Sequence, residues 1–375
     1  MTARYMTSSS VEWTVLLYIG AMDNGQEKAD ETLIQQVITA AVRGTNADFV
    51  YQLVQSDGTL RGAIRPDGRN EILARGARID VTNPEYLTDF VNWALRHFPS
   101  RYTAVFLKDH GNGWALEHTP ARRRKQKQKG LGGLGLFYNG DQDTYMSTAD
   151  LAPAIQETDA KRVDVFGFDA CEMGAIEVAY EIQAVADFMI ATESSESSSG
   201  WPYGPILQRL REHPGPIVPR ELSREVVKLS GATPSLIALE LDWIKTLAKD
   251  IDGLAKILTT QVSDVAPWLA NGPAGKTLAG DIGQLAAGLQ KQFPEGAINF
   301  AARSVLTSLA RASPAEKGGL AIFLPVCSGS NDLASYGTVS FARNNHWTAF
   351  LSALNAELLQ QNLCASASGQ ALSTS

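Results

Sequence analysis

Cysteine and histidine are scarce in this chain of 375 residues. The three cysteines, Cys171, Cys327 and Cys364, form no even disulfide set and no Cys-x-x-Cys pair, which suits a reducing compartment. None of the five histidines has the spacing of a metal ligand with another His or Cys, and no stretch has the pattern of an EF-hand loop. We therefore expect neither a disulfide framework nor a bound metal.

Long apolar runs and an excess of positive charge are also missing. No run approaches the roughly 18 apolar residues of a membrane helix, and residues 1–10 lack the apolar segment of a secretion signal. As the sequence stands, we expect a cytoplasmic protein with no membrane partner. The net charge of -7 argues against general nucleic-acid binding and suits basic substrates. With 44% hydrophobic and 19% charged residues, the composition is that of an ordinary globular protein.

Strand and helix patterns alternate in the first part of the chain. Apolar stretches typical of buried strands cover 14–20, 47–55 and 103–108, and amphipathic helical patterns cover 26–43 and 84–98. Repeated units of this kind predict an α/β fold with a mostly parallel central sheet.

The pattern changes beyond Pro205: residues 236–241 are expected to form one more strand, and helical stretches separated by Pro and Gly follow from residue 242. We expect an α/β core over 11–235 and a mainly helical C-terminal portion over 236–361. The apolar run over 320–324 is expected to return one strand to the core. Residues 1–10 and 362–375 are expected to be tails.

Cys171 follows an apolar run that stops abruptly at a carboxylate, Asp169. The run 163–168 has the composition of a strand buried on both faces, and a helical pattern begins just beyond the cysteine. We therefore expect Cys171 at the C-terminal end of a strand and the N-terminus of a helix, where ligands bind in open α/β sheets and where a thiol pKa is lowered. The competing interpretation is a buried cysteine that acts as a small hydrophobic side chain.

His110 follows a second apolar strand, 103–108, and precedes a Gly-Asn-Gly turn. If the two strands are neighbours, His110 and Cys171 face each other at one edge of the sheet, as a thiol nucleophile and its base require. The backbone N–H groups of Gly111 and Cys171 are then suited to stabilise an oxyanion. A histidine with only local contacts in its turn is the alternative.

The segments around these two residues, Asp-His-Gly-Asn-Gly-Trp over 109–114 and Phe-Asp-Ala-Cys-Glu-Met-Gly over 168–174, resemble the two signature blocks of the clostripain family of cysteine peptidases. The resemblance extends to 13–20, 200–203 and 318–325. It implies the caspase-like three-layer α/β/α sandwich that this family shares with gingipains and caspases, with the peptidase core over the α/β portion. It also implies endopeptidase activity through a Cys171–His110 dyad. No cofactor is required for this chemistry, although calcium supports some family members, and a removed leader would make the protein a secreted one, as some relatives are.

Three roles are open for Asp169: orienting the histidine, capping the helix, or forming the floor of a specificity pocket. The resemblance favours the pocket, in which the acid receives Arg or Lys of a protein or peptide substrate. Where the family often has a further acid, this chain has Ser198 and Ser199. Glu193 and Glu196 are possible substitutes, and the choice between Arg and Lys stays open.

A dense basic run lies between His110 and Cys171. It is expected to be an exposed loop, either simply solvated or binding anions. The resemblance adds a third interpretation, because family members are typically activated by cleavage in this segment. The candidate sites for self-cleavage are Arg122, Arg123, Arg124, Lys125, Lys127 and Lys129. A catalytically silent scaffold and an anion-binding module are the alternative functions; the sequence does not define the natural substrate or the oligomeric state.

Overall fold

The computed structural model describes residues 11–20, 26–113, 135–139, 144–196, 200–213, 215–231, 235–272, 279–313, 319–326 and 330–363. They form two compact units. The first contains the described residues up to Ile244 together with those of 310–320, and the second contains those of 245–309 and from Ala321 onwards.

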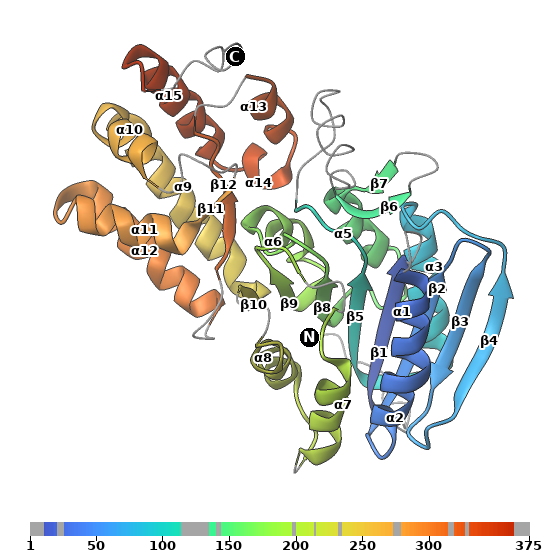
Figure 1. Cartoon of the computed structure of the whole chain (residues 1–375). Coiled ribbons are helices and arrows are strands. Elements are labelled where there is room, and N and C mark those ends of the chain that lie inside the picture. Colours follow the sequence, from blue (N-terminus) through green and yellow to red (C-terminus); the bar gives the residue numbers. More distant parts are fainter. Residues whose placement is uncertain are drawn as a thin grey trace, which may run out of the picture. The chain divides into compact units, whose positions relative to one another are not determined.

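An eight-stranded sheet is the centre of the first unit (Figure 1). Its inner strands β2, β1, β5, β8 and β9 are parallel, and the outer strands β3, β4 and β10 are antiparallel to their neighbours. The prediction of a mostly parallel sheet is therefore confirmed. The strand order is β10 (Leu236–Glu240), β9 (Ala186–Thr192), β8 (Val163–Asp169), β5 (Ser100–Lys108), β1 (Val11–Gly20), β2 (Ala47–Val54), β3 (Thr59–Ile64) and β4 (Asn70–Gly76).

Helices cover both faces of this sheet, which makes three layers. One face packs against η1 (Leu33–Ile38), α2 (Thr39–Val42), α7 (Tyr203–Glu212) and α8 (Pro219–Leu229). The opposite face packs against α3 (Pro84–His97), which contacts α5 (Thr148–Gln156), which in turn contacts α6 (Ile176–Ile182). Because helices cover both faces of the sheet, both sets of side chains on an inner strand are buried, and the sequence of such a strand is continuously apolar instead of alternating between apolar and polar residues.

Strand β1 shows how the residues divide between the layers. Val15, Leu17 and Ile19 belong to the apolar core that includes Ile34 of η1. Tyr18 points to the other face, where its ring lies 5.8 Å from that of Phe90 in α3. Successive side chains of a strand point to opposite faces, so an unbroken apolar strand fills both cores.

The second unit is mainly helical, as the sequence predicts. The apolar run 320–324 does form a strand, β12 (Ala321–Phe323), but β12 pairs with β11 (Ala279–Asp281) in a separate two-stranded sheet. The expectation that this run returns to the core sheet is therefore wrong, since an apolar run predicts a buried strand without naming its partner. The helices are α9 (Ile244–Thr260), α10 (Val262–Asn271), α11 (Ile282–Gln292), α12 (Gly296–Ala312), α13 (Ser330–Tyr336), α14 (Ser340–Arg343) and α15 (Trp347–Gln360).

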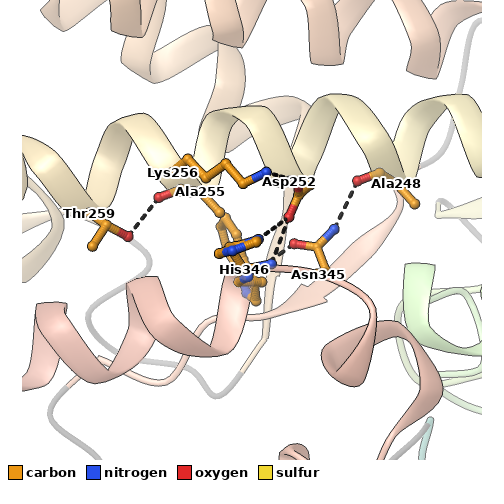
Figure 2. Close-up of polar contacts among 8 residues, drawn as sticks. Ala248, Asp252, Ala255, Lys256, Thr259, Asn345 and His346 are labelled. Atoms are coloured by element: carbon orange, nitrogen blue, oxygen red, sulfur yellow. Dashed lines mark hydrogen bonds and ion pairs between the residues drawn. The ribbon is translucent and has the colours of Figure 1, made fainter.

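A polar group at the start of α15 fastens this helix to α9 (Figure 2). The carboxylate of Asp252 accepts hydrogen bonds from the backbone N–H of His346, at 2.7 Å, and lies 2.8 Å from both His346 Nδ1 and Lys256 Nζ. Asn345 donates to the carbonyl of Ala248. Burial raises the pKa of Asp252, but Lys256 and His346 outweigh it, so the net shift is downward.

Candidate active site

Two neighbouring strands bring His110 and Cys171 to the same edge of the sheet. Strands β5 and β8 are parallel neighbours, and their last residues, Lys108 and Asp169, are paired. The segments that follow the two strands therefore start side by side at the same edge of the sheet. A Cβ atom added at Gly111 would lie 2.4 Å from the carbonyl oxygen of Cys171. Only glycine allows this close approach of the two backbones, and the predicted adjacency of the two strands is confirmed.

The backbone of His110 is fixed from the other side by the segment that begins β6 (Leu136–Asn139). Phe137 N–H donates to the His110 carbonyl at 3.2 Å, and Asn112 N–H donates to the Gly135 carbonyl at 3.0 Å. The side chain of His110 is exposed at the edge of the sheet. Its imidazole is thus held on a short, hydrogen-bonded turn with access to solvent and substrate.

Cys171 is half-buried beneath a loop that follows β9. Glu196 N–H donates to the Cys171 Sγ atom at 3.1 Å, while Glu172 N–H donates to the Ser194 carbonyl at 3.0 Å. Glu172 has a φ of +58°, a left-handed conformation that is uncommon for a residue with a side chain. The loop residues 192–196 therefore run alongside 171–174 and contact the thiol directly.

The expected low thiol pKa is wrong for this arrangement. Helix α6 begins only at Ile176, and residues 171–175 first form a turn, so the N–H groups of the helix do not reach the sulfur. Burial raises the pKa of Cys171, and the charges of Glu196 and Glu172 raise it further, against the backbone N–H groups of Glu196 and of Cys171 itself. The helix cap is Ala175, so capping by Asp169 is also excluded.

Asp169 is the last residue of β8 and is only 4% exposed. Its Oδ2 atom accepts a hydrogen bond of 2.9 Å from the Tyr203 hydroxyl, the Trp201 N–H makes a weaker contact with the carboxylate, and Oδ1 has no hydrogen bond of ordinary geometry within the described residues. Gly200 lies so close that an added Cβ atom would be 2.5 Å from Oδ2. Burial raises the pKa of Asp169, against the charge of Lys108 and the hydrogen bond from Tyr203.

The carboxyl group of Glu196 lies close enough to Asp169 for the two groups to interact electrostatically. Both of its carboxylate oxygens are buried, and within the described residues their hydrogen bonds, from the Trp201 side chain and the Ala170 N–H, are longer or more bent than ordinary ones. Burial and the neighbouring charge of Asp169 raise the pKa of Glu196 to about 9, although Trp201 and Lys108 oppose the shift. Glu193, the other candidate acid, is half-buried at the start of the same loop. Glu196 is thus the acid that shares the buried site with Asp169.

Sequence reasoning missed an ion pair that belongs to this cluster. The Lys108 ammonium lies 3.0 Å from the Asp30 carboxylate, and their side chains are 8% and 5% exposed. Burial lowers the pKa of Lys108, but Asp169 and Asp30 outweigh it and raise the pKa overall. A signal was present in the sequence: Asp30 stands four residues before Ile34, on the apolar side of an amphipathic helix, where a carboxylate requires a partner.

A model of the clostripain family matches residues 18–271, which is more than half of the chain. The chain belongs to the clostripain family of cysteine peptidases. Clostripain of Hathewaya histolytica is 26% identical over 159 residues, which cover 40% of this chain and 29% of that protein. The chain thus matches less than a third of this relative's length.

Two solved structures share the fold of this clostripain-family chain. One is an inactive zymogen C11 protease from Parabacteroides distasonis, with a TM-score of 0.66, 16% identity and coverage of 91% of this chain and 99% of that one. The other is iotapain, a secreted C11 cysteine protease from Bacteroides thetaiotaomicron, with a TM-score of 0.66, 16% identity and coverage of 89% and 98%. At this identity the likeness concerns the fold alone.

Part of the predicted machinery of the clostripain-family chain lies outside the described residues. This holds for the whole basic run 122–129, with its candidate cleavage sites. Cys327 and Cys364, for which no catalytic role is expected, lie outside the described residues as well. Within the described ranges, no helix has the length and apolar character to cross a membrane. The same ranges contain no group of three or more His, Cys, Asp or Glu arranged to hold a metal ion.

Proposed function

We propose that this cysteine peptidase of the clostripain family hydrolyses peptide bonds after Arg or Lys, with Cys171 as nucleophile and His110 as its base. The observation that supports the specificity is the buried acid pair Asp169 and Glu196 next to the thiol. Within the described residues, three of their four oxygens make no hydrogen bond of ordinary geometry and have only weaker contacts with Trp201 and the Ala170 N–H. An ammonium or guanidinium group would supply stronger donors together with a positive charge.

The chemistry follows from the positions of the two candidate catalytic groups. The His110 imidazole takes the thiol proton as the Cys171 sulfur attacks the carbonyl carbon, and the N–H groups of Gly111 and Cys171 stabilise the oxyanion. His110 then gives the proton to the leaving amine, which leaves an acyl-enzyme. A water molecule, deprotonated by His110, hydrolyses the thioester and restores the thiol. No cofactor is needed, and a stimulatory role of calcium stays an expectation from the resemblance.

The raised pKa of Cys171 belongs to the resting arrangement, in which Glu196 N–H contacts the sulfur. A neutral thiol is a weak nucleophile, so the protein at rest reacts slowly with electrophiles. Substrate that pairs its basic side chain with Asp169 and Glu196 adds a positive charge next to the thiol. That charge favours the thiolate, which links recognition of Arg or Lys to activation of the nucleophile.

Activation by self-cleavage within 122–129 is part of this proposal. The run offers the preferred residue type several times between the two catalytic residues. A tethered segment of this length has an effective concentration on the order of mM, which favours an intramolecular first cut. On a denaturing gel, wild-type protein should give two bands and Cys171→Ala a single full-length band. An intact but fully active wild-type chain, or a Cys171→Ala chain cut in purified form, would contradict this step.

The experiment that tests the proposed function uses fluorogenic peptides that differ only in the residue before the cleaved bond: Arg, Lys, citrulline or Asp. Arg and Lys peptides should be cleaved and the Asp peptide should not. Cys171→Ala and His110→Ala should abolish turnover with unchanged circular dichroism, since nucleophile and base act as a unit. Turnover that persists in either variant refutes the dyad. Wild-type protein that cleaves none of these peptides and is not labelled at Cys171 by an Arg-bearing electrophile would instead be a silent scaffold.

A further inference from the structure

The acid cluster beside Cys171 already contains a positive charge of the protein itself. Lys108 and Asp169 are paired in the register of β5 and β8. Paired residues of parallel strands point to the same face of the sheet, so the two side chains leave the sheet side by side. Burial raises the pKa of Asp169 and the charge of Lys108 opposes this rise, as expected for two groups that lie side by side. Lys108 is therefore a competitor for the carboxylate that we propose as the partner of the substrate.

Asp30 offsets the charge of Lys108 in the structure. Its carboxylate lies 3.0 Å from the Lys108 ammonium, and both side chains are almost fully buried. Asp30 lies on α1 (Gln26–Thr32), four residues before Ile34, whose side chain packs in the core on the same face of the sheet as Ile19. The helix thus brings a carboxylate onto Lys108 from above the sheet, while Asp169 lies beside it within the sheet.

The balance of charges depends on this pair. With Glu196 protonated, Asp30 and Lys108 cancel, and the negative charge of Asp169 is left for the substrate. Without Asp30, the same ammonium would offset Asp169, and a basic side chain would enter a pocket with one negative charge fewer. A buried ion pair adds little to stability on average, so a role in setting the charge of the pocket gives this pair a function that folding alone does not.

We propose that Asp30 is a specificity-determining residue, which holds the Lys108 ammonium and thereby leaves the Asp169 carboxylate available to the Arg or Lys side chain of the substrate. Asp30 acts through Lys108 and is a positioning residue. The inference rests on the proposed function, because it concerns the same pocket.

The test is a double-mutant cycle with two substrates. Full-length wild-type protein, Asp30→Asn, Lys108→Met and the double variant are assayed on peptides with Arg or with citrulline, its neutral isostere, before the cleaved bond. Asp30→Asn should lower kcat/KM for Arg at least tenfold, a change that corresponds to about 1.4 kcal/mol, mainly through KM. Citrulline cleavage should change little. In the double variant no ammonium is left to neutralise Asp169, so the preference for Arg over citrulline should recover most of its wild-type value.

A purely structural role predicts a different pattern. In that case Asp30→Asn lowers activity on both peptides in parallel, and removal of Lys108 does not restore the preference; either result overturns the inference. If Asp30→Asn fails to fold, as judged by thermal unfolding, Lys108→Met decides: the preference for Arg must be kept or increased, and a loss refutes the role. If wild-type protein does not prefer Arg over citrulline, the proposed function itself fails. A preference that persists unchanged in Asp30→Asn refutes only this inference.

Discussion

Gly200→Ala tests the contact between the loop residue Gly200 and the carboxylate of Asp169. The added methyl carbon would lie 2.5 Å from Oδ2, 2.9 Å from Oδ1 and 3.0 Å from Cγ of Asp169. Gly200 also has a φ of +67°, in the left-handed region. The substitution therefore introduces two separate penalties, one in the backbone and one at the acid that we propose binds the substrate.

The magnitude follows from these two contributions. A left-handed conformation is unfavourable for an L-residue by about 1–2 kcal/mol. The overlap forces the carboxylate away from the Tyr203 hydroxyl, and the loss of a hydrogen bond to a charged group lowers stability by about 1.5–3 kcal/mol. The free energy of unfolding should thus fall by roughly 3–5 kcal/mol. If about 2 kcal/mol is also lost from substrate binding, kcat/KM on an Arg peptide falls about 30-fold.

The assay combines chemical denaturation with kinetics on Arg and citrulline peptides. Gly296→Ala is the matched control, because Gly296 has a φ of +84° and no heavy atom lies within 4 Å of its added Cβ. The control should show only the backbone penalty, about 1–2 kcal/mol, and unchanged kinetics. If Gly200→Ala loses no more stability than the control, or keeps the wild-type preference for Arg, the contact with Asp169 does not have the role that we assign to it.

Two further predictions concern stability. Glu196 keeps its proton in the folded state up to a pKa of about 9, whereas the unfolded chain releases it near 4.5, so wild-type protein loses stability as the pH rises between these values. Glu196→Gln should therefore be more stable than wild type, with a gap that widens from pH 5 to pH 8 by up to about 1.4 kcal/mol per pH unit; thermal unfolding measures it, and a constant gap argues against the buried proton. Asp252→Asn should loosen the start of α15 by about 1 kcal/mol, seen as faster hydrogen exchange of the His346 amide. The lowered pKa of Asp252 gives stability that is present above the unfolded value of 3.8 and lost as the pH falls through the folded value, so wild type should approach the variant in acid.

The positions of His110 and Cys171 were predictable because both follow strands that read as buried from their composition alone. Parallel strands end at one edge, so the two residues needed only adjacent strands to meet. The start of α6 was not predictable in the same way. Helical spacing shows where a helix exists, but the turn 171–175 is fixed by hydrogen bonds to residues 192–194, which are distant in sequence.

The pairing of Lys108 with Asp30 illustrates a second limit. A single lysine at the end of an apolar strand has an obvious solvated alternative, since its long side chain can reach water from a buried backbone. Only the packing of α1 against the sheet shows that the ammonium group of Lys108 is buried, because Asp30 of this helix is its partner. The sequence made Glu193 and Glu196 equally good candidates for the second acid of the pocket. Only the conformation of the loop after β9 shows which of the two lies next to Asp169.

The strand order determines how the central sheet would be shared between the two polypeptides that the proposed self-cleavage produces. A cut within 122–129 divides the central sheet between β5 and β8, so that β4, β3, β2, β1 and β5 belong to one polypeptide and β8, β9 and β10 to the other. The seam lies along a single pair of strands, with His110 on one side and Cys171 on the other. If the proposed cut and the proposed dyad are right, the cleaved peptidase is a heterodimer in which one polypeptide supplies the base and the other the nucleophile, so that neither is active alone.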